Sequence, residues 1–369
     1  MAAYTKNIKH FESEHIDTHH DSALSVTTGV VDQPIVNPYF VKKRRATLTT
    51  EGYVEGILAG NITILSQAIT LVESSNPAHY AQAQQIIERC LPHSGRSIRI
   101  GITGVPGAGK STFIEAVGGM VVERGHRLAV LAIDPSSERS GGSILGDKTR
   151  MNTISANPDV FIRPSPSAGS LGGVARKSRE TIILCEAAGY DIILIETVGV
   201  GQSETVVHSM VDLFMMLQIV GAGDELQGIK RGIMEMSDMM VITKADGENM
   251  LRAEMAQRQY RNAMMLFPMP PSGVRPEVYT CSSVEGNGLE DVWSAVEGYI
   301  SKVNENNYFT ERRQSQLRYW MRETINNTLL SNFYNHPEVE RVIKQYEDDL
   351  YNEKITPFVA AYQLLEITK

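Results

Sequence analysis

The chain has 369 residues, of which 42% are hydrophobic and 21% are charged, with a formal net charge of −8. This length suggests about two or three domains with a sizeable core, and the composition is typical of a globular protein. The negative charge argues against nucleic acid or a membrane as a partner, because both are anionic surfaces.

Cysteine usage and hydropathy narrow the class of protein further. Cys90, Cys185 and Cys281 are far apart and lack CxxC spacing, which predicts neither a disulfide framework nor a cysteine zinc site. No apolar run approaches the roughly 20 residues that a membrane helix needs. The start of the chain has acidic residues and no hydrophobic signal core, so we expect a cytoplasmic protein.

Residues 1–50 lack helical or alternating periodicity and are predicted to form an irregular arm. The arm contains His10, His15, His19 and His20. These histidines either hold a metal ion or are scattered along a solvated segment. We favour the solvated segment, because the spacing is loose and no cysteine joins them.

Residues 51–95 are predicted to form a helical hairpin or small bundle. Gly60 and Asn61 interrupt the apolar pattern as a plausible helix end and a new N-cap. The apolar positions at helical spacing are Ile57, Leu58, Leu65, Ala68, Ile69 and Val72.

Residues 96–303 alternate short apolar runs with helical stretches, which predicts an α/β domain with a mainly parallel central sheet. Ligands then bind where the strands end. The expected strands are Ile98–Thr103, Leu128–Ile133, Ile192–Ile195, Leu213–Val220, Met239–Thr243 and Val278–Cys281.

Residues 304–369 are predicted to be a helical arm. An apolar stripe ends at His336-Pro337, and Thr356-Pro357 starts a last helix. The stripe either packs on its own domain or forms a dimer interface, and its spacing does not decide between them. Its members are Leu317, Trp320, Met321, Ile325, Leu329 and Phe333.

The sequence GVPGAGKST follows the first predicted strand and opens a helix, which is the context that a phosphate-binding loop requires. The glycines let main-chain N–H groups turn toward the β-phosphate, and the helix N-terminus adds positive potential. Lys110 reaches the β- and γ-phosphates, while Ser111 offers a hydroxyl to Mg²⁺. The loop comprises Gly104, Val105, Pro106, Gly107, Ala108, Gly109, Lys110, Ser111 and Thr112.

VITKAD and CSSVEGNG, at the ends of two later strands, predict guanine recognition. The Asp246 carboxylate accepts from both the ring N–H and the amino group of guanine, a pair of donors that adenine lacks. The stem of Lys244 can lie over the base, and the Ser282-Ser283-Val284 stretch can support it through main-chain N–H groups. Thr243 occupies a position where asparagine is commoner, which weakens the prediction for this loop but leaves the guanine-reading carboxylate unaffected.

Long motifs along the chain closely resemble the MeaB/ArgK family of P-loop GTPases. The matches run from about residue 50 to the end and leave the first 50 residues uncovered. They include AITLVES (68–74), GITGVPGAGKSTFIEA (101–116), AIDPSS (132–137), SGGSILGDKTRM (140–151), GSLGGVA (169–175), IETVGVGQSE (195–204) and GAGDELQGIKRGIME (221–235).

The resemblance implies a GTP- and GDP-binding chaperone that gates cofactor loading into an adenosylcobalamin-dependent acyl-CoA mutase and protects that enzyme. Methylmalonyl-CoA mutase is the usual partner in this family. The family also implies a homodimer formed through the C-terminal helical arm.

By motif, the resemblance places Asp134, Asp147 and Glu196 around Mg²⁺ together with Ser111. Lys110, Asp134 and Glu196 are then the expected catalytic residues. The family has glutamate where other P-loop proteins have aspartate at the position of Glu196. The resemblance also implies a mobile loop that transmits nucleotide state to the mutase, with charged residues Asp224, Glu225, Gln227, Lys230 and Arg231.

Val200 stands where a water-orienting glutamine might be expected, and its side chain has no hydrogen-bonding group. We therefore expect slow intrinsic hydrolysis that accelerates when a partner reshapes residues 134–150 and 221–232.

Three alternatives remain open. A nickel-delivery GTPase would share the fold and Glu196, but it would need a preorganised Cys/His site. An ATP-dependent transport kinase is disfavoured by Asp246. A nucleotide-gated scaffold would hydrolyse GTP too slowly to matter.

Overall fold

The computed structural model describes residues 48–74, 76–133, 151–164, 171–197, 203–220 and 231–368. These residues belong to one compact unit, Leu48–Lys369. Several predicted residues lie outside the described residues: the four N-terminal histidines, Asp134, Asp147, Val200, Asp224, Glu225, Gln227 and Lys230.

A seven-stranded sheet forms the centre of the unit, with the order β3-β2-β4-β1-β5-β6-β7. All of the described strand pairs are parallel. The strands are β1 (Ile98–Gly104), β2 (Leu128–Ile133), β3 (Val160–Arg163), β4 (Ile192–Thr197), β5 (Leu213–Ile219), β6 (Met239–Thr243) and β7 (Glu277–Thr280).

The predicted mainly parallel sheet is confirmed, and the six expected strands are present to within two residues at each end. The strand β3 was not predicted from the sequence. This strand has only four residues and pairs with β2 alone at the edge of the sheet, so its apolar run is too short to distinguish from a loop.

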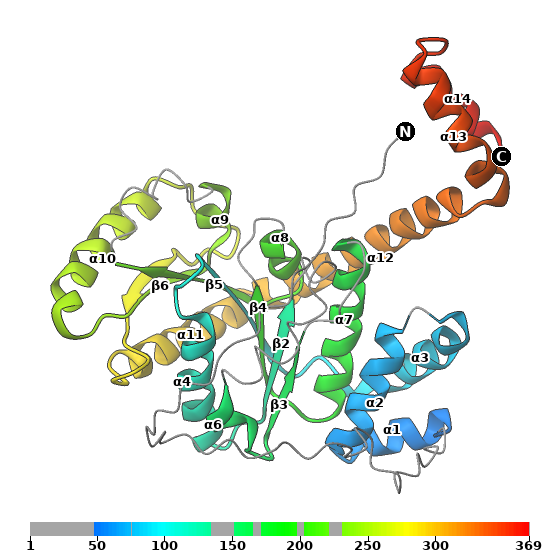
Figure 1. Cartoon of the computed structure of the whole chain (residues 1–369). Coiled ribbons are helices and arrows are strands. Elements are labelled where there is room, and N and C mark those ends of the chain that lie inside the picture. Colours follow the sequence, from blue (N-terminus) through cyan, green and yellow to red (C-terminus); the bar gives the residue numbers. More distant parts are fainter. Residues whose placement is uncertain are drawn as a thin grey trace, which may run out of the picture. The chain divides into compact units, whose positions relative to one another are not determined.

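Helices cover both faces of the sheet (Figure 1). On one face α4 (Lys110–Glu123), α6 (Asn152–Ser155) and α11 (Leu289–Glu305) form a core with the strands, in which Phe113 and Trp293 are buried. On the other face lie α7 (Leu171–Ala187) and α8 (Ser203–His208). Burial on both sides explains why the central strands are apolar almost throughout.

The N-terminal segment forms three helices that pack on α7, followed by a short turn: α1 (Thr50–Leu58), α2 (Ile62–Glu73), α3 (Pro77–Cys90) and η1 (Leu91–His93). The predicted break is confirmed, because Gly60 has a φ of 71° and the Asn61 side chain accepts from the N–H groups of Thr63 and Ile64. The predicted core residues are buried except Leu58, which is 39% exposed.

The second half of the chain adds α9 (Arg231–Met236), η3 (Gly247–Asn249) and α10 (Met250–Met265) near β5, β6 and β7. The tail forms α12 (Tyr308–Tyr334), α13 (Pro337–Tyr351) and α14 (Pro357–Glu366), and Thr356 caps α14 as predicted. Within the described part of the chain, no helix is long and apolar enough to cross a membrane.

The base of α12 is attached to the sheet by charged side chains. Arg312 pairs with Asp238 at 2.9 Å, and Arg313 pairs with Asp212 at 2.7 Å. Asp238 and Asp212 also accept from main-chain N–H groups of β5 and β1. Because these carboxylates lie beside the amino ends of strands, the first turns of α12 are held at the edge of the sheet opposite the predicted ligand site.

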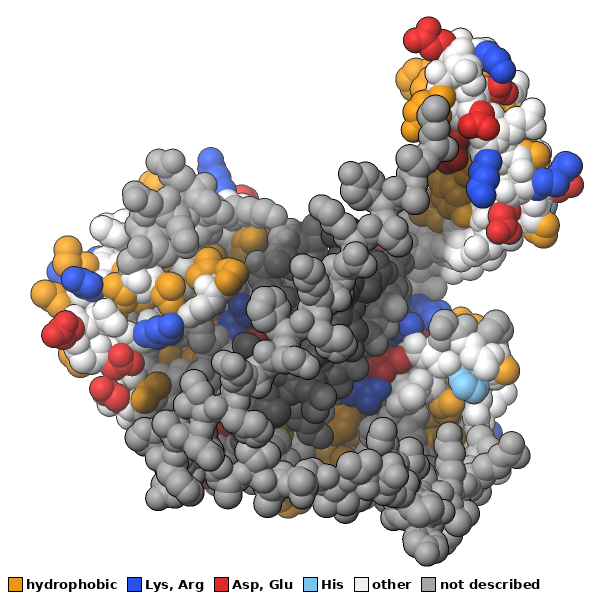
Figure 2. Space-filling view, viewed as in Figure 1, with side chains coloured by type: hydrophobic (Ala, Val, Ile, Leu, Met, Phe, Trp, Pro, Cys, Tyr) orange, Lys and Arg blue, Asp and Glu red, His pale blue; other side chains and the backbone are white. Residues whose placement is uncertain are grey.

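The apolar stripe of α12 divides between two environments. Trp320 packs against the core on the face of the sheet that α7 and α8 cover, and its indole N–H donates to the Ser209 carbonyl at 2.9 Å. Leu317, Met321, Ile325 and Leu329 are each about half exposed or more. Large hydrophobic side chains are also exposed on α10 and α14 (Figure 2).

Candidate nucleotide-binding site

The phosphate loop, residues 104–112, joins β1 to α4 at the carboxyl edge of the sheet. A Cβ atom on Gly104 would lie 2.4 Å from the Leu217 carbonyl oxygen, so only glycine lets the loop pass this close to β5. Gly109 has a left-handed φ of 77° and occupies the N-cap position of α4. The predicted loop therefore opens a helix beside β5, as anion binding at a helix N-terminus requires.

Lys110 begins α4, and its side chain folds back over the phosphate loop. Its Nζ donates to the Gly104 carbonyl at 2.9 Å and lies 3.5 Å from the Val105 carbonyl. Burial lowers the pKa of the Lys110 ammonium, and the negative charges of Glu196 and Glu204 oppose that shift. The two carbonyl groups thus hold the Lys110 ammonium over the phosphate loop, where we expect the phosphate oxygens to bind.

Ser111 and Glu196 meet across the sheet although they are 85 positions apart in the chain. The Ser111 hydroxyl donates to Glu196 Oε1 at 3.2 Å. The register that pairs Ile102 of β1 with Glu196 of β4 brings the carboxylate beside the phosphate loop. Two hard oxygen donors side by side fit Mg²⁺, which prefers carboxylate and hydroxyl oxygens. The other two predicted magnesium residues, Asp134 and Asp147, are outside the described residues.

The base loop, Lys244–Asp246, follows β6 and is held by the end of β7. The Ser282 hydroxyl donates to Asp246 Oδ2 at 2.7 Å and accepts from the Glu285 N–H at 3.1 Å. A carboxylate oriented in this way suits the recognition of two neighbouring donors on guanine. Lys244 has a φ of 57°, and its Cε lies 3.9 Å from the position of a Cβ built on Gly109.

The structure differs from the expectation for Ser282 in one respect. Its main-chain N–H donates to the Asn287 carbonyl at 2.9 Å, so within this loop the hydroxyl is the group that faces Asp246. Ser283 is partly buried, and Val284 is 84% exposed. No sequence pattern would have revealed the Ser282–Asp246 bond, because it joins two different strand ends.

The Thr243 side chain lies between the base loop, the phosphate loop and β5. Its hydroxyl is 2.7 Å from the Ala108 carbonyl of the phosphate loop and 3.0 Å from the Gln218 carbonyl of β5. Threonine at this position therefore ties the base loop to the phosphate loop.

One described residue of the predicted partner loop is Arg231, which begins α9. It is exposed, and its guanidinium lies 5.7 Å from the centre of the Phe267 ring. The described part of the chain contains no group of three or more His, Cys, Asp or Glu residues that could hold a metal ion. A preorganised nickel site is thus not found among these residues.

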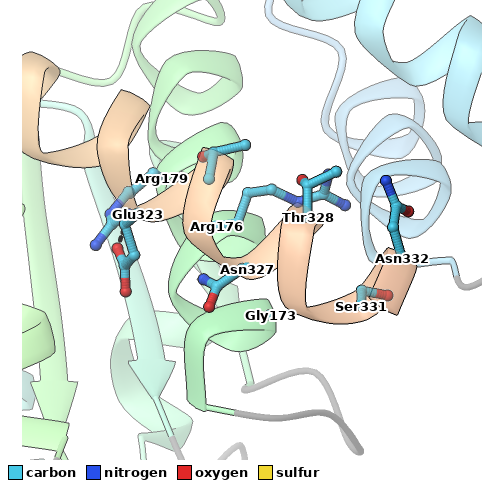
Figure 3. Close-up of a pocket in the computed structure, with 9 residues that line it drawn as sticks. Gly173, Arg176, Arg179, Glu323, Asn327, Thr328, Ser331 and Asn332 are labelled. Atoms are coloured by element: carbon cyan, nitrogen blue, oxygen red, sulfur yellow. Dashed lines mark ion pairs between the residues drawn. The ribbon is translucent and has the colours of Figure 1, made fainter. Parts of the chain in front are cut away.

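A cavity of about 280 Å³ lies away from the phosphate loop, between α7 and α12 (Figure 3). Arg179 pairs with Glu323 at 2.5 Å at one end of it. Its remaining lining residues are Gly173, Arg176, Thr324, Asn327, Thr328, Ser331 and Asn332. We place the nucleotide at the phosphate loop because the glycine-shaped backbone, Lys110 and the base loop converge there.

Comparison with protein families gives a match over most of the chain. Residues 65–338 match the model of a family described as methylmalonyl-CoA mutase-associated GTPase MeaB. The match covers the phosphate loop, Glu196 and the base loop.

Several curated proteins resemble the chain over most of its length. A probable GTPase of Mycobacterium tuberculosis is 48% identical over 319 residues, which are 86% of this chain and 95% of that protein. GTPase ArgK of Escherichia coli is 43% identical over 307 residues, or 83% and 93% of the two chains. A mouse protein named methylmalonic aciduria type A homolog, mitochondrial, is 44% identical over 324 residues, or 85% and 78%.

A solved structure described as LAO/AO transport system kinase superposes with a TM-score of 0.70 at 35% identity. The match covers 86% of this chain and 97% of that one. The P-loop α/β fold is therefore shared with a protein of related sequence.

Proposed function

The chain belongs to the family of methylmalonyl-CoA mutase-associated GTPases, MeaB, and from that premise we propose that it serves an adenosylcobalamin-dependent acyl-CoA mutase as a nucleotide-driven chaperone. It is a GTPase, which hydrolyses GTP to GDP and phosphate. In the proposed role, GTP binding and hydrolysis gate the loading of the cobalamin cofactor and protect the mutase from inactivation. Methylmalonyl-CoA mutase is the partner that we propose first.

Each part of the nucleotide would meet a different part of the site. The N–H groups of the phosphate loop hold the β-phosphate, and Lys110 exchanges the Gly104 carbonyl for phosphate oxygens. Asp246 binds the guanine edge, while Ser282 keeps its carboxylate oriented. Ser111 and Glu196 would hold Mg²⁺ with Asp134 and Asp147. An ion held there would neutralise negative charge on the phosphates.

The observation that carries the proposal is the pairing of Glu196 with Ser111, in a chain that has Val200 three positions after the last residue of β4. The site has the groups that bind and neutralise a triphosphate. Val200 lacks a hydrogen-bonding group that could orient the attacking water. Supplying such a group or a charge clamp from a partner changes rates by roughly 10³–10⁵. Slow intrinsic turnover and acceleration by the mutase follow from this arrangement.

GTP turnover by the full chain, measured with and without the cognate mutase, tests the proposal. We expect turnover to rise on complex formation, and the Lys110→Ala variant to lose turnover under both conditions. Protection of the mutase is measured in parallel with both proteins. Protection by Lys110→Ala equal to that by the wild type would favour a scaffold over a hydrolytic chaperone, and unchanged turnover with the mutase would overturn the proposed activation.

We also propose that residues 304–369 form a dimerisation arm, alongside an N-terminal arm (1–50), a helical segment (51–95) and a GTPase domain (96–303). The half-exposed apolar side chains of α12, such as Ile325 and Leu329, support an interface with a second copy. Because the base of α12 is fixed to the sheet by Arg312 and Arg313, contact between arms would link two GTPase domains. We propose the cytoplasm as the location of the complex.

A further inference from the structure

Thr243 connects three segments of the nucleotide site through one hydroxyl group. It is the last residue of β6, and it is 2% exposed. Its Oγ1 lies 2.7 Å from the Ala108 carbonyl oxygen and 3.0 Å from the Gln218 carbonyl oxygen. The base loop starts at the next residue. One side chain thus touches the phosphate loop and the end of β5 at the point where the chain turns to meet the base.

The peptide between Ala108 and Gly109 carries the effect of this hydrogen bond toward the phosphates. The described residues contain no cis peptide bond, and the C=O and N–H of a trans peptide point in opposite directions. Ala108 is fully buried, and its carbonyl points toward β6. The N–H of Gly109 therefore points away from β6, toward the open side of the loop, where main-chain N–H groups bind phosphate.

The Thr243 side chain can donate fewer hydrogen bonds than an asparagine at the same position. A hydroxyl has one hydrogen to donate, whereas an amide has two. The shorter distance makes Ala108 the main acceptor, and Gln218 shares the same hydrogen at 3.0 Å. The β-branched side chain also has few rotamers, which holds the hydroxyl in place at the end of the strand.

We propose that Thr243 is a positioning residue for the diphosphate: it fixes the Ala108 carbonyl and thereby aims the Gly109 N–H at the β-phosphate. This role concerns the GTPase site itself and does not depend on the mutase partner. It predicts an effect that is specific for nucleotides with a β-phosphate. GDP has one and GMP does not.

Calorimetric titration of the full chain with GDP and with GMP, in the presence of Mg²⁺, tests this role. We expect Thr243→Val to bind GDP about 10-fold more weakly, equivalent to about 1.4 kcal/mol, because one buried hydrogen bond to the loop is lost. Binding of GMP should change by less than about 2-fold. Thr243→Ser keeps the hydroxyl and should restore GDP affinity to within about 3-fold of the wild type.

Thr181→Val is the matched control, because this buried threonine donates only within α7, to the Lys177 carbonyl. It should leave both affinities unchanged. Equal losses for GDP and GMP, an unaffected Thr243→Val, or a Thr243→Ser as weak as Thr243→Val would each overturn the proposal. If the valine variant does not fold, as judged by its melting curve, Thr243→Ala compared with Thr243→Ser decides by the same criteria.

Discussion

The Ser111 hydroxyl and the Glu196 carboxylate lie 3.2 Å apart at the carboxyl edge of the sheet. Ser111 belongs to the first turn of α4, and Glu196 lies in β4, next to the strand that leads into α4. A glutamate in this strand can therefore reach the helix that carries the phosphate loop. Glu196, which stands where aspartate is more usual, is thus adjacent to the predicted magnesium position.

Glu196→Gln tests whether this carboxylate helps to hold magnesium. The amide keeps the shape and loses the charge, so the Mg²⁺ concentration that gives half-maximal GTP turnover should rise by about 10–100-fold. Binding of GDP in the presence of EDTA should be unchanged. Titration of turnover against Mg²⁺ measures the effect. An unaltered magnesium dependence would exclude Glu196 from the metal environment.

Asp246→Asn tests base recognition. In asparagine an N–H donor replaces one of the two accepting oxygens, so the side chain can no longer accept from both donors of guanine. The new N–H group can instead donate to the second carbonyl of xanthine. We expect GTP binding to weaken by at least about 100-fold and XTP binding to strengthen. Competition between the two nucleotides measures the preference, and a variant that still prefers GTP would show that Asp246 does not select the base.

Ser282→Ala tests the orientation of the Asp246 carboxylate separately. The loss of the 2.7 Å hydrogen bond should weaken GDP binding by about 10-fold while the preference for guanine remains. Ser178→Ala is the matched control, because this buried serine donates within α7 to the Val174 carbonyl. If both variants bind GDP like the wild type, the hydroxyl of Ser282 has no positioning role.

His208, at the end of α8, predicts a pH dependence of stability. Burial lowers the pKa of His208 from 6.5 to about 4, the positive charge of Arg312 acts in the same direction, and Asp238 opposes it. The unfolded chain takes up a proton as the pH falls through about 6.5, whereas the folded chain does so only near pH 4. The free energy of unfolding therefore decreases over this range, by about 2 kcal/mol between pH 7.5 and pH 5.

Urea unfolding of wild type and His208→Gln at pH 7.5 and pH 5.0 measures this contribution. The variant should lose less stability on acidification than the wild type. His93→Gln provides the control, because His93 is exposed in η1. An identical pH dependence in His208→Gln and the wild type would contradict the prediction.

Leu329→Glu tests the proposed dimerisation arm. Leu329 is 62% exposed on α12, so a charge there should leave the melting temperature of the chain nearly unchanged and prevent an apolar interface from forming. Sedimentation velocity should show a dimer for the wild type and a monomer for the variant. Leu266→Glu, at an 86% exposed position after α10, should remain dimeric. A dimeric Leu329→Glu would argue for another interface.

Local patterns in the sequence were sufficient for the class of fold and for the contiguous motifs. The phosphate loop is recognisable because glycines, Lys110 and Ser111 act through backbone geometry at fixed spacing, and Asn61 and Thr356 cap their helices within three residues. Six strands were predicted from apolar runs, because each run is also a local feature of the sequence. The short edge strand Val160–Arg163 was missed, since four residues have too little periodicity to identify.

The long-range pairings were decided only by the tertiary structure. Ser111 with Glu196, Ser282 with Asp246 and Thr243 with Ala108 join residues 85, 36 and 135 positions apart. Their contacts depend on which strands are neighbours and on the register between them, and neither is encoded in local spacing. The sequence alone determined which chemical groups were present, and the order of the parallel strands decided which of them meet at one edge of the sheet.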